Sequence, residues 1–284
     1  MKNVVALFLT VSFSISLFAN VSNSEKNILI KLYQNTNGSQ WIVKWDLNAS
    51  VSTWYGVKIV NDKVVGINLS NNNLVGTLPA EITDLKNLVE LDLFKNQISG
   101  TIPKDIGKLK KLQQLNLSFN KLSGSIPNSI CEIEHLKGLM IFMNNLSGQL
   151  PSKIGNLKEL EVVCLFNNQL SGELPTSLYD LQHLQELALS SNNFSGQISK
   201  NVENLVSLEK LSLFDNKMNG QIPFNIVKLD NLEKVNLAYN SFSGFVPNTL
   251  AQKDGFNLTM RNESGIAFKL EVVNTSRGVL AADE

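Results

Sequence analysis

Four side chains in the sequence could take part in nucleophilic or metal chemistry. They are Cys131, Cys164, His135 and His183, the two cysteines and two histidines of the chain. A Cys164–His183 pair would supply a thiol and a base, but no third group that would orient the base is apparent. No carboxylate or thiol at metal-ligand spacing joins the histidines. We therefore expect no catalytic residue, no metal ion and no cofactor.

The composition excludes several classes of protein. The chain has 284 residues, and its 25 Lys+Arg are balanced by 25 Asp+Glu. A net charge of zero does not fit a nucleic-acid binder. A hydrophobic fraction of 43% is too high for a disordered chain. We expect Cys131 and Cys164 to point to different faces, so a disulfide between them is not predicted.

The first residues resemble a signal that directs secretion. Lys2 precedes an apolar run from Val4 to Phe18, and the small residue Ala19 suits a cleavage site. We therefore expect residues 1–19 to be a signal peptide and the mature chain to be secreted, periplasmic or extracellular, without a stable membrane span. An uncleaved N-terminal anchor is the alternative.

A repeat with a period of 24 residues occupies residues 64–247. Gly follows each repeat's asparagine by four residues and Pro by seven, except that Ser199 replaces one proline, where we expect a slightly looser turn. All seven prolines of the chain occupy this one repeat position. The asparagines that mark the eight copies are Asn72, Asn96, Asn120, Asn144, Asn168, Asn192, Asn216 and Asn240.

Each fixed position has a physical explanation in a stacked coil. Leu91 and Leu93 point inward from a short strand while Asp92 points outward, because strand side chains alternate. The asparagine amides can bond backbone groups along the stack, which forms a structural ladder. Apolar residues at a spacing of three, such as Ile106 and Leu109, predict a short helical or 3-10 turn on the convex face. One coil buries little surface alone, so stacking supplies the core.

The repeats resemble the plant-type class of leucine-rich repeat. One copy reads Leu112-x-x-Leu115-x-Leu117-x-x-Asn120-x-Leu122-x-Gly124-x-Ile126-Pro127. The resemblance implies an α/β horseshoe, a solenoid with a parallel β-sheet on its concave face and 3-10 or extended segments on its convex face. In that class a Trp-x-Gly-Val cap is flanked by two cysteines, and here Ser52 and Ile59 hold those positions. Because it lacks that cap disulfide, the chain is more similar to secreted bacterial members of the class than to plant receptors.

Both ends of the repeat array carry segments suited to cap it. Residues 20–63 hold all three tryptophans and a predicted helix with Ser24 as its N-cap, ending between Asn35 and Gly38. Aromatic packing would replace the disulfide in this N-terminal cap. Residues 248–284 form a predicted C-terminal cap, where alternating apolar positions from Phe256 to Met260 and from Ile266 to Val272 indicate a β-hairpin.

The outward positions of the concave strands supply the candidate ligand-binding residues. Phenylalanine stands two residues before the asparagine in half of the repeats, and Met140, Met143, Val162 and Cys164 join two of them in an expected exposed apolar patch. The candidate residues are Phe94, Met140, Phe142, Met143, Val162, Cys164, Phe166 and Phe214. Phe94 and Phe214 are expected to lie apart from the patch. The alternative is that phenylalanine is a filler that packs along its own stack.

These features predict a secreted, non-catalytic binding protein. The concave face would recognise a protein or peptide, or a glycan, and no nucleic acid. Its rigid sheet and exposed aromatic side chains are typical of an interaction surface. The alternative is a eukaryotic, plant-like extracellular defence or adhesion protein, similar to inhibitors of pathogen enzymes that use this repeat.

Overall fold

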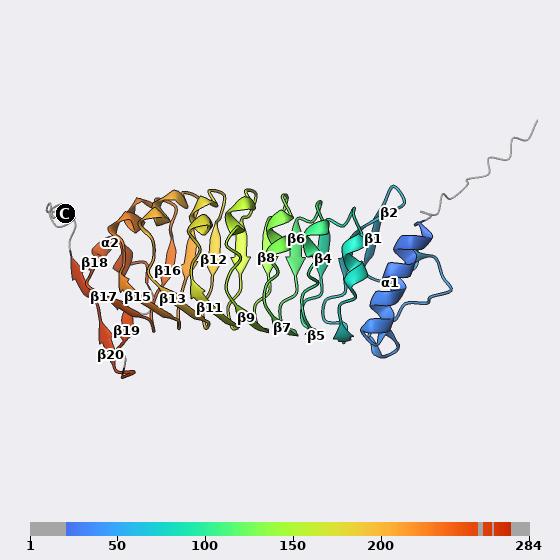
Figure 1. Cartoon of the computed structure of the whole chain (residues 1–284), viewed down its shortest axis with the longest axis horizontal. Coiled ribbons are helices and arrows are strands. Elements are labelled where there is room, and N and C mark those ends of the chain that lie inside the picture. The colour runs from blue at the N-terminus through green and yellow to red at the C-terminus, as the bar shows by residue number, and fades with distance from the viewer. Residues whose placement is uncertain (1–20, 255–257, 263, 274–284) are drawn as a thin grey trace, which may run out of the picture.

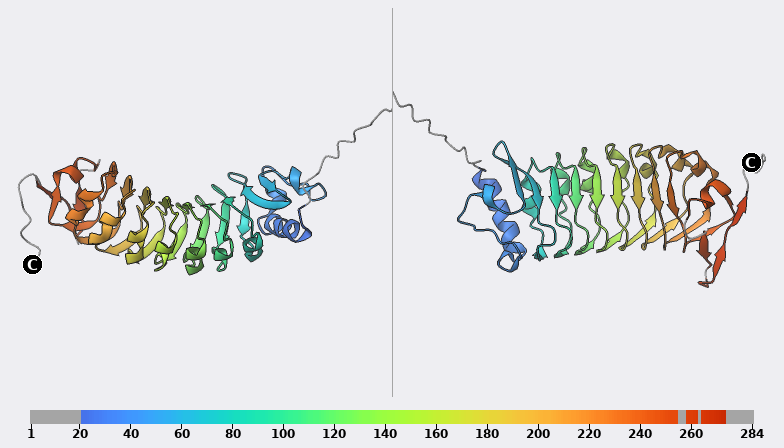
Figure 2. Two further views of the ribbon diagram at one scale, coloured as in Figure 1. Left: turned by 90° about the horizontal axis from the view of Figure 1, so that it is seen from above. Right: turned by 180° about the vertical axis from the view of Figure 1, so that it is seen from behind.

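The predicted leucine-rich repeat solenoid is confirmed. A computed structural model of the protein describes residues 21–254, 258–262 and 264–273. The coils stack side by side into one elongated body, with the helical cap at one end and short strands at the other (Figure 1). Seen from above, the stack follows a shallow arc (Figure 2, left). The predicted signal peptide, residues 1–19, lies outside the described residues.

The concave face is a sheet of nine strands to which every repeat contributes one. All neighbours are parallel except the first pair, and Leu91, for example, lies opposite Ile67 and Leu115 in the adjacent strands. In spatial order the strands are β1 (Val57–Val60), β2 (Lys63–Asn68), β4 (Glu90–Asp92), β6 (Gln114–Asn116), β8 (Gly138–Met140), β10 (Val162–Cys164), β12 (Glu186–Ala188), β14 (Lys210–Ser212) and β16 (Lys234–Asn236).

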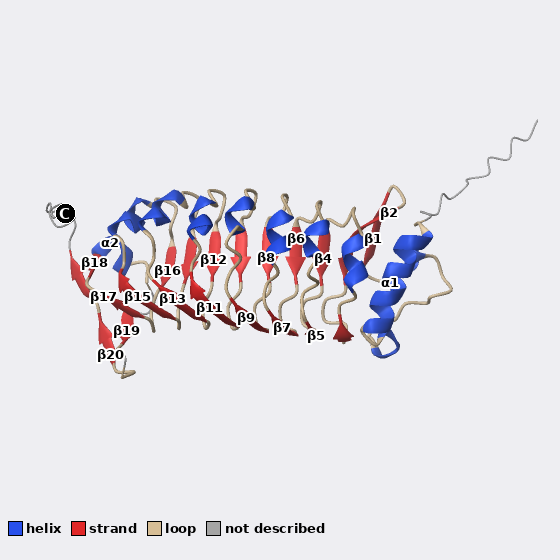
Figure 3. Cartoon of the chain, in the orientation of Figure 1, coloured by secondary structure: helices blue, strands red, loops and turns tan. Residues whose placement is uncertain are grey.

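A second parallel sheet lies along one flank of the solenoid and was not predicted. It forms because the segment after each asparagine is extended until a glycine such as Gly124, with φ +76°, turns the chain. Figure 3 shows the two rows of strands and the row of helices that closes each coil. Its strands are β3 (Val75–Thr77), β5 (Gln97–Gly100), β7 (Lys121–Gly124), β9 (Asn145–Gly148), β11 (Gln169–Glu173), β13 (Asn193–Gly196), β15 (Lys217–Gln221) and β17 (Ser241–Ser243).

The predicted 3-10 turns on the convex face are confirmed. Those of the repeats are η3 (Ala80–Asp84), η4 (Ile106–Lys108), η5 (Asn128–Glu132), η6 (Ile154–Asn156), η7 (Thr176–Asp180), η8 (Lys200–Asn204) and η9 (Phe224–Lys228). The expected loosening at Ser199 is wrong, because its φ of −66° and ψ of 149° match those of Pro127. The amide that proline lacks is satisfied, since Ser199 N–H donates to Tyr179 Oη at 3.1 Å.

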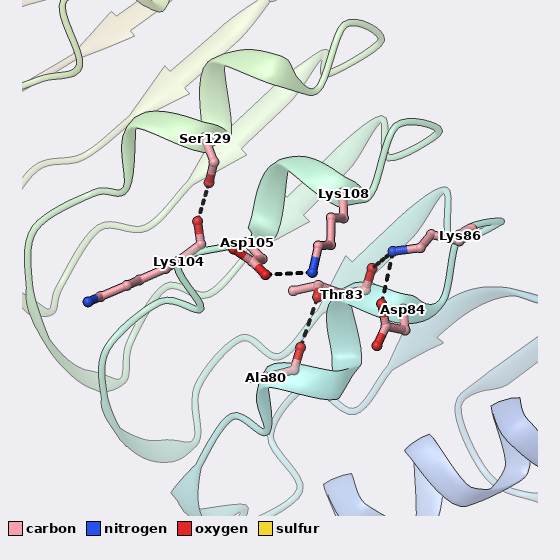
Figure 4. A network of polar contacts seen from close by, with 8 residues as sticks. All are labelled: Ala80, Thr83, Asp84, Lys86, Lys104, Asp105, Lys108 and Ser129. Atoms are coloured by element: carbon pink, nitrogen blue, oxygen red, sulfur yellow. Dashed lines mark hydrogen bonds and ion pairs between the residues drawn. The ribbon is translucent and has the colours of Figure 1, made fainter.

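Polar side chains of the convex face bond locally, within a coil or to the next one (Figure 4). Thr83 Oγ1 donates to Ala80 O at 2.9 Å, and Lys86 pairs with Asp84 at 3.0 Å. A hydrogen bond from Lys108 holds the pKa of Asp105 below its usual value. Exposed pairs of this kind contribute little to stability because water screens them.

The predicted asparagine ladder is confirmed and ties each coil to the one before it. Asn120 Oδ1 accepts the amide of Ile98 at 2.9 Å, and Asn120 Nδ2 donates to Leu93 O at 3.0 Å and to Leu117 O at 3.1 Å. At the first coil, Asn72 Oδ1 accepts instead from Val43 N at 2.7 Å. The same amide therefore joins repeat to repeat and repeat to cap.

The N-terminal cap is a helix packed beside a stack of aromatic rings. Helix α1 (Asn23–Asn35) begins earlier than predicted: Ser22, not Ser24, is the N-cap, because its hydroxyl accepts from Glu25 N at 3.3 Å. Trp45 packs against Trp41 and Trp54 with ring centroids 4.9 and 4.7 Å apart. Short 3-10 turns η1 (Gly38–Gln40) and η2 (Val51–Thr53) directly precede Trp41 and Trp54. Aromatic packing holds this cap, as expected.

The C-terminal cap contains the predicted hairpin in a shorter form. Strands β19 (Thr259–Arg261) and β20 (Ala267–Lys269) pair antiparallel, while Phe256 lies outside the described residues. The hairpin does not continue to residue 272, because β21 (Glu271–Val273) instead pairs in parallel with β18 (Phe245–Pro247). A short helix, α2 (Asn248–Ala251), follows β18.

Candidate functional site

A continuous row of aromatic side chains follows the ends of concave strands β4, β6, β8 and β10. Phe142 and Phe166 are stacked, with centroids 4.3 Å apart and ring planes at 15°. Phe119 meets Phe142 edge-on at 5.5 Å and Phe94 at 5.4 Å. These four residues are called the aromatic row below. The expectation that Phe94 lies apart is therefore wrong, because Phe119 bridges it to Phe142.

Two rings of the row, Phe94 and Phe142, approach each other above the small residue Ser118. Phe94 and Phe142 belong to coils two strand spacings apart, about 10 Å, yet their ring centroids are separated by 6.4 Å. Ser118, in the coil between them, is fully buried, and its hydroxyl has no hydrogen-bond partner among the described residues. A phenylalanine at this position would occupy the space into which the neighbouring rings lean.

Phe119 was missed because it occupies the repeat position directly before the asparagine. That position has a left-handed backbone in every repeat, with φ of 54° at Phe119 and 55° at Met143. This conformation costs about 1–2 kcal/mol for residues other than glycine and is best tolerated by Asn and Asp. The signal in the sequence was an aromatic residue, Phe119, at a position where other repeats carry Asn71 and Asn167.

The other predicted apolar residues lie beside the row, but Cys164 is not exposed. Met140 and Cys164 are opposite each other in β8 and β10, and half-buried Val162 lies opposite Gly138. Cys164 retains only 8% of its exposed surface, and its Sγ lies 3.6 Å from Glu186 Oε1. The Glu186 side chain from the next coil lies against the thiol. The exposed apolar surface beside the row therefore consists of Met140, Met143 and Val162.

Phe214 belongs to a different group. Its ring meets Tyr239 edge-on at 5.1 Å, and the guanidinium of Arg261 lies 4.2 Å from the centre of the Tyr239 ring. Tyr239 occupies the same left-handed position as Phe119, with φ of 58°. Phe214 and Tyr239 are called the aromatic pair below. Arg261 belongs to β19, so this pair is connected to the C-terminal cap.

The cysteines and histidines that could act as nucleophile, base or metal ligand do not come together. Burial raises the pKa of Cys164 to about 12 and that of Cys131 to about 11, and both thiols are free. His183 is exposed beside η7 on the convex side, whereas Cys164 lies on β10. His135 bonds Glu159 at 2.8 Å. A Cys164–His183 nucleophile pair is therefore not formed. No group of three or more metal-ligating side chains occurs in residues 21–254, 258–262 and 264–273.

Charged side chains form the border of the apolar surface. Lys137 and Glu161, which precede β8 and β10, pair at 3.6 Å and are each about 40% exposed. Lys95 lies exposed beside Phe94. An apolar centre with a charged rim can exclude water from a ligand segment and also orient it.

Family models match a continuous part of the chain. A leucine-rich repeat region matches residues 127–252, two leucine-rich repeat copies match residues 86–131, and a single leucine-rich repeat matches residues 63–85. These residues include the row and the aromatic pair.

Solved structures of plant receptor ectodomains share the fold. The Arabidopsis receptor kinase HAESA, in complex with the peptide hormone IDA and the co-receptor SERK1, has a TM-score of 0.72 and 31% identity, covering 89% of this chain and 42% of that chain. The PEPR1–AtPEP1 complex has a TM-score of 0.68 and 30% identity, covering 81% of this chain and 37% of that chain. A plant ice-binding protein, 23% identical with a TM-score of 0.69 over 86% of both chains, shows the fold alone.

The Arabidopsis leucine-rich repeat receptor protein kinase EMS1 is 44% identical over 87 residues, which are 30% of this chain and 7% of that protein. The chain thus spans less than half the length of these receptors. No helix among the described residues is long and apolar enough to cross a membrane. The repeat spacing, the asparagine ladder and the two-sheet coil agree with these matches: the chain belongs to the leucine-rich repeat proteins, with repeats of the plant-receptor type.

Proposed function

We propose that this protein is an extracellular, non-catalytic binding protein that recognises a peptide or a protein segment along the aromatic row. The observation that carries the proposal is the contact of four phenylalanine rings across four successive coils. A phenylalanine that served only as a filler would pack on phenylalanines at the same position of the neighbouring repeats. Here the rings come from two repeat positions, and one of them, Phe119, has a left-handed backbone and is 39% exposed.

The row is suited to anchor a ligand. Its rings are held by one another and by a rigid sheet, so little conformational entropy is lost when a partner covers them. Aromatic side chains bury a large apolar area and form a large share of binding hot spots. Half-buried Met140 and Met143 extend this surface and can adapt to the shape of a partner.

The relatives support a peptide as the ligand class. The HAESA and PEPR1 structures are complexes with IDA and AtPEP1, and the first also holds a co-receptor. A glycan is the alternative ligand, since aromatic rings on an open face also suit sugars. Location outside the cell is proposed from the signal-like residues 1–19, together with the receptor ectodomains that the chain resembles.

The absence of catalysis is proposed from the reactive side chains. Cys164 stays protonated at neutral pH, because burial raises its pKa to about 12. A nucleophilic cysteine requires a thiolate and a nearby base, and His183 does not supply one.

The test is selection of a random displayed peptide library on the purified protein. Peptides selected on the natural protein are expected to carry two or more aromatic or aliphatic residues. The double variant Phe142→Ala with Phe166→Ala is expected to bind these peptides about 100-fold more weakly, because truncation of two hot-spot rings costs several kcal/mol.

Phe224→Ala is the matched control. Phe224 is 39% exposed, like Phe119, but lies in η9 on the convex face. It should leave the affinity unchanged. Equal affinity of the double variant and the natural protein would refute the role of the row. Binding of glycans on an array, without binding of any peptide, would identify a glycan as the ligand class.

A further inference from the structure

Beyond the aromatic row, the concave face carries a shallow hollow of about 430 Å³ over strands β12, β14 and β16. In Figure 1 these strands lie toward the C-terminal end of the sheet, past the coils of the row. Its floor includes Ala188 and Ser212. The charged side chains that line it are Glu186, Lys210, Lys234 and Lys253.

The charges of this hollow do not cancel. Glu186 supplies the one carboxylate of the lining, and it is already paired with Lys210 at 3.2 Å and in contact with Cys164 at 3.6 Å. Lys253 donates to the backbone oxygen of Leu232. The side chain of Lys234, which also lines the hollow, has neither an ion pair nor a hydrogen bond within the described residues, so it adds a cation that no anion pairs with.

The ion pair with Glu186 stabilises the charged form of Lys210. The hydrogen bond from Lys210 to Glu186, together with their mutual attraction, raises the pKa of Lys210. Glu209 and Glu233 directly precede β14 and β16 but do not line the hollow. A ligand atom placed there therefore meets more cations than anions, over a partly apolar floor. This favours a carboxylate, whose hydrogen bonds to ammonium groups are stronger than those between neutral groups.

On this basis we propose that the hollow is a second subsite that takes a carboxylate of the same peptide whose apolar residues occupy the aromatic row. The inference rests on the proposed function, because it specifies the chemistry of the proposed ligand. The carboxylate can be an acidic side chain or the C-terminus, and both present the same charge and oxygen atoms.

The fold sets the separation of the two subsites. Phe166 lies two residues past the end of β10, whereas Lys234 is the first residue of β16, so the two repeat positions differ by four residues, or about 13 Å, along the strand direction. From β10 to β16 are three strand spacings, about 14 Å. The diagonal is about 19 Å, which an extended peptide spans with about six residues. The ligand should therefore cross the sheet obliquely, with its carboxylate about six residues from its nearest apolar anchor.

The experiment uses the same displayed library, presented with free C-termini, on the natural protein and on Lys234→Gln. The natural protein should enrich peptides with apolar residues and, about six positions away, Asp, Glu or the C-terminus. Lys234→Gln should retain the apolar preference and lose the acidic one. The exposed Lys217→Gln, in β15 of the other sheet, removes an equal charge and should change neither preference.

A double-mutant cycle on the best selected peptide makes the test quantitative. Replacement of the peptide's carboxylate by an amide should weaken binding to the natural protein about tenfold, as expected for a hydrogen bond to a charged group. On the double variant Lys210→Gln with Lys234→Gln the same replacement should change the dissociation constant less than about twofold. Amidated C-termini and Asp→Asn peptides, tested separately, identify the source of the carboxylate.

The outcomes separate this inference from the proposed function. Peptides that depend on Phe142 and Phe166 but show no acidic preference would overturn the carboxylate subsite and leave the aromatic row as the binding site. An equal loss from the amide on the natural protein and on the lysine variant would overturn it as well. Selected peptides that bind the phenylalanine variant unchanged would refute the proposed function itself.

Discussion

The aromatic row and the aromatic pair are built from the same repeat positions and have different surroundings. Each combines a phenylalanine two residues before the asparagine with an aromatic residue at the left-handed position, Phe119 in the row and Tyr239 in the pair. The row's rings contact one another across coils, while Tyr239 lies under Arg261 of the cap. Tyr239 N also donates to Thr259 O at 2.7 Å.

This difference shows that residue type alone does not define a binding surface. The pair lies in the last two coils, where a solenoid must cover its open end, and its Tyr239 ring contacts Arg261 of the hairpin β19–β20. The row lies within the stack, where neighbouring coils already satisfy the backbone. The rings of the pair therefore serve the cap, and we infer that those of the row serve a partner.

The backbone framework under the two groups should respond equally to mutation. Asn120 and Asn240 make matching bonds: their Oδ1 atoms accept from Ile98 N at 2.9 Å and from Met218 N at 3.0 Å. Either Asn→Ala change leaves buried backbone groups without partners. Each should lower the free energy of unfolding by about 3 kcal/mol, as measured by urea denaturation.

Exposed Asn145 provides the control, since Asn145→Ala should change stability little. A cost of less than about 1 kcal/mol for Asn120→Ala would mean that the ladder is not a stabilising element at the row. Unequal costs at Asn120 and Asn240 would show that the frameworks under the two groups differ.

Replacement of Arg261 should affect the aromatic pair and leave the aromatic row unchanged. Arg261→Ala removes the cation from the face of Tyr239, which should destabilise the cap by about 1 kcal/mol. Hydrogen exchange of the β19 amides should accelerate accordingly, while peptide affinity at the row stays unchanged. Lys269→Ala, in the paired strand β20, is the control for a loss of positive charge. Weaker peptide binding by Arg261→Ala alone would show that the pair contributes to recognition.

The parts of the fold that follow from the repeat could be predicted, and the parts that depend on side-chain size could not. The strands, the 3-10 turns and the asparagine ladder repeat every coil, so one copy such as Leu112 to Pro127 contains their whole pattern. The second sheet was missed because its strands carry at most one buried residue each, as Leu122 in β7, and show little alternation.

The candidate site could be predicted only in part. Phe142 and Phe166 share a repeat position in adjacent coils, so their contact follows from the register alone. The inclusion of Phe94 depends on the small size of Ser118 and on the ring of Phe119, two features of a single coil. The burial of Cys164 depends on the rotamer of Glu186, which no spacing in the sequence specifies.

The smallest expected effect concerns two serines that occupy equivalent positions. Ser118 lies beneath the row with a buried hydroxyl that has no partner among the described residues, whereas Ser190 Oγ lies 2.6 Å from Ser212 Oγ. Ser118→Ala removes a desolvated polar atom and keeps the small volume, so it should leave stability unchanged or raise it by up to about 1 kcal/mol. Ser190→Ala should lower it by about 1 kcal/mol, because one hydrogen bond is lost.

Thermal unfolding of the two variants side by side measures this difference, and Ser212→Ala should reproduce the loss seen for Ser190→Ala. A loss of stability for Ser118→Ala equal to that for Ser190→Ala would mean that the Ser118 hydroxyl is bonded in solution. The space under the row would then be polar and hydrated, and the rings would not form the dry, preorganised surface on which peptide binding is proposed to depend.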